Sequence, residues 1–567
     1  MQIFDYEYRV GGPIVTEPVP NHALPIYILK STLCNLQSSP PHSQLSPLYV
    51  CCLRRSIRDI AMRHLSLRWW VPLLVLILPI AARTNEPAEP QQQARVRRAS
   101  GAGMWYPADA NSLREAVDGY LSLTESVVPN KPVALIVPHA GYAYSGPVAG
   151  AMYATLEGHR YDRVIVLGLS HGTMLRGASV LSVDAYETPL GRTPADIEVR
   201  AKLLDCPVVT EQPAAHRNEH SAENQLPMLQ RALGEFELVE MLVGEMTDEE
   251  RVVLARALRD LIDEETLLVV SSDFTHYGRN FGYAPFSDRV PERLQALNDA
   301  AVQEILEVDV PGWDLFLRDT QATICGRNPI SLLLETLYPY DDIAGRRIAF
   351  ATSGEKTGDY TNSVTYAGIA FWRIGEGLNR DERQTLLQLA RNTATDYLAG
   401  NSPPSVDVNS YHLTPRLASL GAAFVTLRND GELRGCIGHI MSVVPLYHSV
   451  AENAYRACID PRFRQQPVTL HEAPDLEIEV SVLTPMRRLL DPEKVRVGTD
   501  GLLIVSGRNR GVLLPQVPIE QGWGREEFLA GACLKAGLPA DAWRDPNTEI
   551  YRFSAQVFGE AENRRNR

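Results

Sequence analysis

Short apolar runs that lead into polar clusters are the feature of this sequence that most constrains its fold. Five such runs lie between residues 101 and 374, and nearly every position in them is apolar. A strand that is covered by helices on both faces needs this pattern, whereas a strand with one wet face alternates. The predicted strands are Val133 to Val137, Val164 to Leu167, Leu238 to Val243, Leu267 to Val270 and Ile348 to Thr352.

Stretches of helical length separate these runs, and such alternation is typical of an α/β domain with a mainly parallel sheet. Ligands bind beyond the carboxyl ends of the strands in such sheets. Three runs lead there into clusters that contain His139, His171 and, after Asp273, His276. One histidine after a strand is usually a hydrogen-bonded loop residue, but three in this register predict a common crevice.

Cys325 lies just before a predicted helix. Asn328 is placed to cap that helix, and Pro329 is placed to begin it. A helix N-terminus and the nearby Arg327 are expected to lower the pKa of the Cys325 thiol. The resulting thiolate would serve either as a metal ligand or as a reactive nucleophile.

A further polar segment runs from Glu219 to Pro227. If it is helical, His220 and Glu223 share one face, because residues three apart are neighbours on a helix. The alternative interpretation is a surface helix with a capping serine.

Five motifs in this region, PHAGYAYSG, LGLSH, EHSAENQLP, SSDFTHYG and TICGRNPI, resemble those of the Memo family. That family is similar in fold to the class III extradiol dioxygenases, and the resemblance covers residues 104–374. It implies a metal site of two histidines and a cysteine, whereas the dioxygenases use a carboxylate instead of the thiol. By motif, the implied ligands are His139, His171 and Cys325.

The resemblance also implies iron or copper as the metal, with zinc as a further candidate. It also implies that His220, Asp273 and His276 either support the metal ligands or act as acids and bases. The predicted substrate-binding residues, which lie in or beside the same motifs, are Tyr142, Glu223 and Arg327.

A second domain is predicted over residues 381–558, after a linker at 375–380 and before a polar tail at 559–567. A helix with a regular apolar stripe begins near Asp381, and Gly400 is placed to end it. Two strands flank the turn signal at residues 429–431, and the segment 476–482 alternates as a strand with one wet face does. These elements predict an α+β domain.

The motif LRGCIG, together with DPRF and LLPQV further on, resembles the AMMECR-type domain. Its Arg434, Gly435, Cys436 and Gly438 could form an anion-binding or nucleophilic site, because glycine lets backbone approach a ligand closely. A bulged strand with a buried cysteine is an equally good interpretation. The fusion resembles the AmmeMemoRadiSam set, which implies a separate radical-SAM partner, since this chain has no CxxxCxxC motif.

The first hundred residues are rich in Pro, Ser, Gln and Arg, and we predict no fold there. Within them a basic segment from Met62 precedes an uncharged apolar run at residues 69–82, which is the pattern of a secretory signal. Fourteen residues span roughly 21 Å as a helix, less than the roughly 30 Å of a bilayer core. A signal anchor or a non-targeting apolar run are the alternatives. The segment predicts export or membrane association, whereas the family context predicts the cytoplasm.

Charge and cysteine content exclude several classes of protein. The formal net charge is −14, and residues 101–567 hold 44 Lys and Arg against 63 Asp and Glu. Such a surface repels phosphate backbones, so the sequence predicts no nonspecific nucleic-acid binding, and a local basic groove is the alternative. The eight cysteines show no CxxC spacing, which argues against a disulfide scaffold. We predict Cys206, Cys458 and Cys533 to be buried free thiols.

Two classes of function remain open from the sequence. The chain is either a metal-dependent redox enzyme, in the manner of an oxidoreductase or a dioxygenase, or a non-catalytic scaffold that binds metal or peptide. The number of titratable groups near the predicted crevice favours the enzyme. The expected partner in the crevice is a small molecule or a peptide.

Overall fold

The structure, a computed structural model, describes residues 94–123, 128–375, 377–401, 407–442 and 444–560. The predicted signal-like segment lies outside these residues. In the part of the chain that is described, no helix has the length and apolar character needed to cross a membrane.

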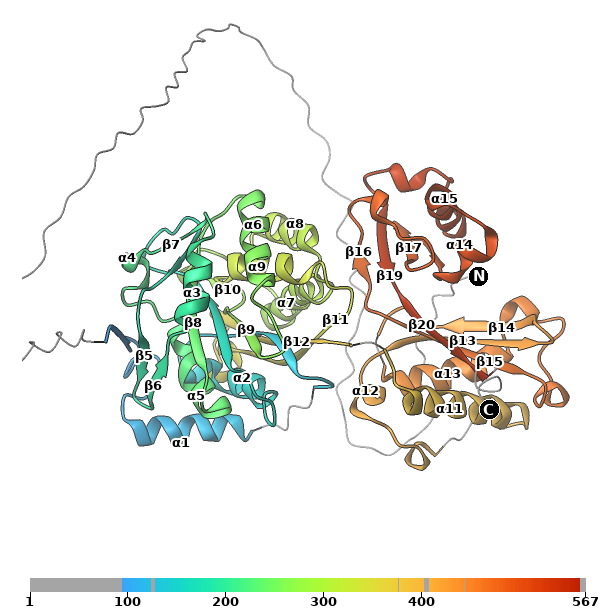
Figure 1. The fold of residues 1–567 in the computed structure, drawn as a ribbon, viewed down its shortest axis with the longest axis horizontal. Helices are drawn as coiled ribbons and strands as arrows, with labels where there is room; N and C mark the ends of the chain where they lie inside the picture. The colour runs from blue at the N-terminus through green and yellow to red at the C-terminus, as the bar shows by residue number, and fades with distance from the viewer. Residues whose placement is uncertain (1–93, 124–127, 376, 402–406, 443, 561–567) are drawn as a thin grey trace, which may run out of the picture. The chain divides into compact units, whose positions relative to one another are not determined.

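A nine-stranded mixed sheet forms the centre of the first domain (Figure 1). Its four middle strands are parallel and correspond to four of the predicted runs: β2 (Pro132–Val137), β9 (Thr266–Ser271), β3 (Arg163–Gly168) and β8 (Glu237–Val243). The fifth predicted run is part of an antiparallel strand, β11. The flanking strands are β10 (His276–Gly278), β12 (Asn362–Arg373), β11 (Ile343–Thr352), β4 (Ala178–Val180) and β7 (Val209–Thr210).

Helices cover both faces of this sheet, as its apolar strands require (Figure 1). Successive residues of β2 show the arrangement, because Leu135 belongs to one core and Ile136 to the other. One core contains residues of α1 (Ala110–Leu121), α2 (Tyr142–Ala154) and α5 (Leu226–Leu233). The other contains residues of α3 (Ile197–Leu204), α6 (Asp248–Arg259), α7 (Val290–Leu306), α8 (Val310–Thr320) and α9 (Arg327–Leu337). Two short helices are α4 (Pro213–His216) and α10 (Ser353–Thr357).

The fold begins before residue 101, which corrects the predicted end of the unstructured segment. Residues Val96–Arg98 form β1, which pairs in parallel with β5 (Ala185–Thr188), and β6 (Gly191–Pro194) completes this small sheet. The composition of this segment, which is rich in arginine, predicts an unstructured chain. One of those arginines, Arg97, has a side chain that is only 9% exposed and is paired with buried carboxylates.

The second domain is α+β, as predicted, and contains two four-stranded antiparallel sheets. The first has the order β14 (Glu432–Gly438), β13 (Ala422–Asn429), β15 (Glu477–Leu483) and β20 (Ala555–Gly559). The second has the order β16 (Arg487–Arg488), β19 (Glu549–Phe553), β17 (Gly501–Ser506) and β18 (Asn509–Leu513). The helices are α11 (Arg380–Leu398), α12 (Pro415–Ala418), α13 (Leu446–Cys458), α14 (Gln516–Gln521) and α15 (Arg525–Lys535).

The predicted end of the first helix and the predicted turn of this domain are confirmed. Gly400, at φ 103°, follows the end of α11, and Asp430 and Gly431 at positive φ form the turn between β13 and β14. The polar tail was placed two residues too early, because β20 includes Gly559 and Glu560 accepts hydrogen bonds from Arg391. The predicted buried thiols are confirmed at Cys206, Cys458 and Cys533.

Candidate metal centre

The three predicted ligands come together at the place of the predicted crevice, where β2, β9 and β3 end side by side. These strands are parallel neighbours, so the segments that follow them start at the same edge of the sheet. One ligand atom from each of His139, His171 and Cys325 lies within 4.8 Å of the other two. The His139 and His171 rings meet edge to face, with centroids 5.3 Å apart. The three residues are therefore close enough for one metal ion to contact all of them.

The hydrogen bonds of Ser271 fix which nitrogen of His139 is free. The Ser271 hydroxyl donates to the carbonyl oxygen of Ser221 at 2.5 Å and accepts from Nε2 of Gln225 at 2.7 Å. Its remaining contact, to His139 Nδ1 at 3.0 Å, must then be a hydrogen bond that His139 donates. His139 Nε2 is left with a lone pair, and it lies 3.3 Å from the Cys325 sulfur. Burial lowers the pKa of His139 to about 4, so this ring is neutral, as a metal ligand must be.

Glu219 orients His171 in a similar way. A carboxylate can only accept, so the 3.0 Å contact between Glu219 Oε1 and His171 Nδ1 is a hydrogen bond that the ring donates. In its neutral form, which a metal ligand needs, His171 therefore also has Nε2 free. The same carboxylate accepts backbone N–H bonds from His171 and Ser221. Although burial acts in the opposite direction, these bonds hold the pKa of Glu219 at about 2, and the group stays ionised.

Cys325 differs from its prediction in two respects. The helix that follows begins at Arg327 with Gly326 as its N-cap, because the Asn328 side chain donates instead to Glu245. Burial, followed by the nearby Asp273 carboxylate, raises the pKa of the thiol well above its usual range, and Arg327 pairs with Glu245 at 2.7 Å. The helix N-terminus and Arg327 therefore do not lower the pKa of the Cys325 thiol as predicted. A bound cation would favour the thiolate, as it does for coordinating thiols in general.

The predicted acid/base residues surround the same crevice. His220 is stacked between Trp105, at a centroid distance of 3.9 Å, and His171, at 4.7 Å. Burial, followed by the neighbouring His139, lowers the pKa of His220 to about 4. Asp273 is buried and accepts backbone N–H bonds from His139 and Ala140. It fixes the loop that carries the first ligand.

His276 contacts two carbonyl oxygens, those of Phe274 and Thr323, through Nδ1 at 3.0 Å. Carbonyls only accept, so Nδ1 carries a proton, and in the neutral ring Nε2 is free.

The segment around His220 is not an α-helix. His220 precedes a short 3-10 turn, η1 (Glu223–Gln225), and α5 starts only at Leu226.

Two predicted substrate-binding residues have other partners. Glu223 is buried, and its two oxygens accept from the backbone N–H and hydroxyl of Ser100, the N–H of Gly101 and the hydroxyl of Tyr106. A carboxylate has about four acceptor positions, so none is left for a substrate. Tyr142 is also buried, and its hydroxyl donates to the carbonyl oxygen of Asn224 at 2.7 Å. Both residues stabilise the fold beneath the crevice.

Comparisons with known families divide the chain in the same way as the structure. The profile of the Memo-like protein family matches residues 97–370, and the AMMECR1 profile matches residues 387–558. The chain belongs to both families. The first match begins at the buried Arg97, within β1, and includes all three residues of the candidate metal centre.

Relatives and solved structures match parts of the chain. A protein of Methanothermobacter thermautotrophicus is 44% identical over 190 residues, which cover 32% of this chain and 96% of that protein. One of Methanopyrus kandleri is 43% identical over 200 residues, 33% of this chain and 93% of its own length. The crystal structure of an uncharacterized protein from Pyrococcus horikoshii has 40% identity and a TM-score of 0.29. This match covers 31% of this chain and 89% of the Pyrococcus horikoshii chain.

The glycines of the predicted AMMECR1-domain motif serve packing. A Cβ at Gly435 would lie 2.0 Å from the carbonyl oxygen of Ala457, and one at Gly438 would lie 2.2 Å from the Phe424 ring. The pairing of β13 with β14 shifts register between Leu427 and Arg428, which leaves Arg434 as the extra residue of a bulge. Of the two interpretations, the bulged strand matches the structure.

The cysteine and arginine of this motif are also occupied. Cys436 is 9% exposed and its sulfur accepts from the Thr426 hydroxyl at 3.3 Å. Burial raises the pKa of its thiol, which disfavours a nucleophile. Arg434 Nε donates to Glu472 at 2.9 Å. These contacts give no support to a nucleophilic or anion-binding site.

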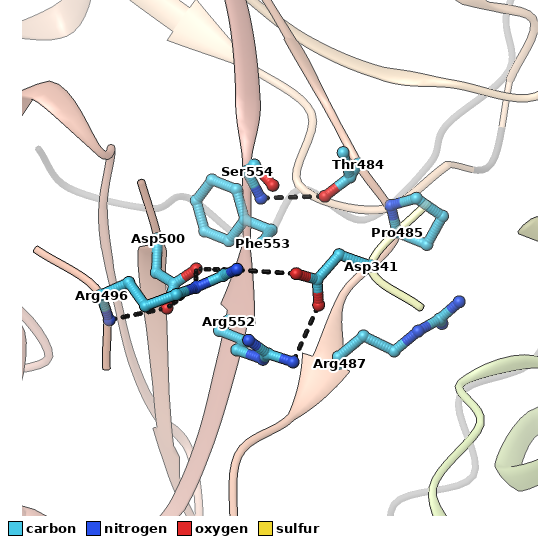
Figure 2. A pocket seen from close by; sticks show the side chains of 9 residues that line it. All are labelled: Asp341, Thr484, Pro485, Arg487, Arg496, Asp500, Arg552, Phe553 and Ser554. Atoms are coloured by element: carbon cyan, nitrogen blue, oxygen red, sulfur yellow. Dashed lines mark hydrogen bonds and ion pairs between the residues drawn. The ribbon is translucent and has the colours of Figure 1, made fainter. Parts of the chain in front are cut away.

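Figure 2 shows a second polar cluster, at the centre of which ion pairs join two aspartates and two arginines. Asp341 accepts from Arg496 at 2.7 Å and pairs with Arg552 at 2.8 Å, and Arg496 pairs in turn with Asp500 at 2.6 Å. The charged groups of this cluster thus satisfy one another, and we assign it a role in stabilising the structure.

Proposed function

We propose that this protein is a metal-dependent redox protein that binds iron or copper through His139, His171 and Cys325. The observation that supports this proposal is the donor set itself: two imidazole Nε2 atoms with free lone pairs beside one sulfur. Imidazole and thiolate together bind copper, iron and zinc well, whereas carboxylates and carbonyls favour Mg²⁺ and Ca²⁺. Zinc is a further candidate on the same chemistry.

Three protein ligands leave coordination positions open for a substrate. A bound iron or copper ion would supply one-electron redox chemistry and polarise a ligand beside it. The chain's own residues hold the site for this. Ser271 and Glu219 set the tautomers of the two histidines, and such outer contacts raise the basicity of the ligands.

Proton transfer at the site is assigned in this proposal to His276 and His220. His276 keeps Nε2 free while Nδ1 is held by two carbonyls, so it can take up or release a proton at one defined atom. His220 is kept neutral by burial and is fixed by its stack with Trp105. Arg327 lies at the exposed rim and could contact a small molecule or peptide if it left Glu245.

Anaerobic purification followed by metal analysis tests the proposal. We expect about one iron or copper per chain, an absorption band that changes on reduction, and loss of both in Cys325→Ser. Zinc alone, with no response to reductant, would favour a non-catalytic scaffold. Metal that stays in Cys325→Ser or His171→Ala would overturn the site. A separate radical-SAM partner for the two domains remains part of the proposal, and co-purification from the native source tests it.

A further inference from the structure

Arg97 connects the beginning of the fold to the candidate metal centre. Its side chain is 9% exposed, although the neighbouring Arg98 is 82% exposed. Arg97 lies on β1, and the chain directly after it is fixed by Ser100 and Gly101, which donate to Glu223. We refer to residues 95–101 as the N-terminal strap.

One nitrogen of the Arg97 guanidinium holds the segment that ends in Glu219. Nη2 donates to the carbonyl oxygen of Glu219 at 2.8 Å and contacts that of His216 at 3.4 Å. Asn218 lies between them at φ 57°, a left-handed conformation that costs energy for most residues. The guanidinium thus fixes the backbone of the same residue whose carboxylate orients His171.

The other nitrogen balances buried negative charge. Nη1 lies 3.2 Å from Glu240, on β8, and 3.5 Å from Glu223. Both carboxylates have side chains that are at most 3% exposed, and buried charges need a partner. Within the described part of the chain, Arg97 is the one arginine or lysine that forms an ion pair with either of them. A planar fork reaches both sides at once, which an ammonium group does not.

We propose that Arg97 is a positioning residue for the candidate metal centre, through its bond to the backbone of Glu219 and the hydrogen bond from His171 to the Glu219 carboxylate. The N-terminal strap is then a working part of the site. The expected effect of Arg97 on metal affinity rests on the proposed function, whereas its expected effect on the orientation of His171 does not.

The experiment compares Arg97→Met with Arg98→Met in the full chain. Methionine has a similar length but no hydrogen bonds or charge. Arg98 provides a matched control, because it is exposed and its ion pair with Glu187 is long at 3.8 Å. The first measurement is nitrogen NMR of labelled histidines in the metal-free protein. We expect one Nδ1–H tautomer of His171 in the wild type and in Arg98→Met, and a mixture of tautomers in Arg97→Met.

The second measurement is the dissociation constant for Cu²⁺ in competition with a chelator. Loss of an outer contact to a metal ligand typically weakens binding by roughly 10–100-fold, and we expect this range for Arg97→Met and less than about twofold for Arg98→Met. A folded Arg97→Met with the wild-type tautomer and affinity would overturn the inference. If Arg97→Met does not fold, Arg97→Lys, which keeps the charge but not the fork, decides by the same measurements.

The two readouts separate this inference from the proposed function. Equal affinity for Cu²⁺ in the wild type and in Cys325→Ser would contradict the three-ligand site. The tautomer of His171 in Arg97→Met would still show whether the strap positions the ring. Glu219→Ala provides the reference for a His171 that has lost its acceptor, because alanine has no side-chain oxygen.

Discussion

The two domains contain similar cysteine–glycine motifs, but the structure uses them differently. Cys325-Gly326 lies between a strand-like bridge at Ile324 and the start of α9, whereas Cys436 lies inside β14 between two paired residues. The Cys325 sulfur lies 3.3 Å from Nε2 of His139, which follows the end of another strand, β2. The Cys436 sulfur faces Thr426, its own cross-strand neighbour.

Glycine content does not distinguish the two motifs. A Cβ at Gly326 would lie 2.3 Å from the Ser272 side chain, and one at Gly435 would lie 2.0 Å from the Ala457 backbone. In both places glycine permits close packing. What distinguishes them is convergence, because among the described residues the ligands that come from several strand ends meet in the first domain and not in the second. Motif composition alone therefore does not identify a site in this chain.

The largest expected difference is in metal content between Cys325→Ser and Cys436→Ser. A serine hydroxyl stays protonated near neutral pH and is a far poorer ligand than a thiolate. We expect Cys325→Ser to lose more than roughly 100-fold in affinity for Cu²⁺, beyond what an outer contact costs. Cys436→Ser should bind metal as the wild type does. Metal analysis and chelator competition measure both.

Stability provides the control for this comparison. Cys325→Ser should unfold at nearly the wild-type temperature, whereas the buried Cys206→Ser should lose about 1–3 kcal/mol if its hydroxyl finds no partner. Equal metal affinity in Cys325→Ser and Cys436→Ser would remove the difference between the two motifs.

Gly435→Ala should affect folding and not metal binding. The added methyl would meet backbone atoms of α13, which cannot turn aside as a flexible side chain does. Overpacking of this kind costs about 1–3 kcal/mol. Gly559→Ala, with its nearest contact at 3.4 Å, is the matched control and should be nearly neutral. Denaturant unfolding of the full chain, followed by a probe in the second domain, compares them, and a neutral Gly435→Ala would contradict the packing role.

The sequence predicted the central strands because full burial leaves an unambiguous apolar signal. It missed β12, because the buried polar residues Ser363 and Thr365 interrupt the apolar pattern at the start of that strand. It also missed β1, since an arginine-rich stretch indicates solvent exposure unless its carboxylate partners are known. Glu223 and Glu240 lie more than a hundred residues away, and only the fold brings them to Arg97.

The candidate ligands were predictable for a different reason. Strand ends of a parallel sheet meet at one edge, so His139 and His171 could be placed together from strand positions alone. Their supporting residues could not. The sequence gives no role to Ser271, Trp105 or Glu219, although Glu219 directly precedes His220 in a predicted motif. A carboxylate next to a candidate ligand was the available signal.

The smallest expected effect concerns Arg434, which the comparison assigns to an ion pair and not to a bound anion. The hydrogen bond from Arg434, together with contacts from Thr469, lowers the pKa of Glu472 to about 2, below the roughly 4.3 of an unfolded chain. A depressed carboxylate pKa stabilises the fold above pH 4.3, and this contribution is lost as the pH falls toward 2. The pair lies near the surface, so it is worth up to about 1 kcal/mol.

Arg434→Gln should therefore raise the pKa of Glu472 toward its ordinary value and weaken the loss of stability between about pH 4.3 and pH 2. Carbon NMR titration of the Glu472 carboxyl group measures the first effect, and unfolding at several pH values measures the second. Arg428→Gln is the matched control, because its contact is to the Gly431 carbonyl at 3.4 Å. A Glu472 pKa that stays near 2 in Arg434→Gln, together with wild-type resonances that shift on addition of inorganic phosphate, would return Arg434 to the role of an anion-binding residue.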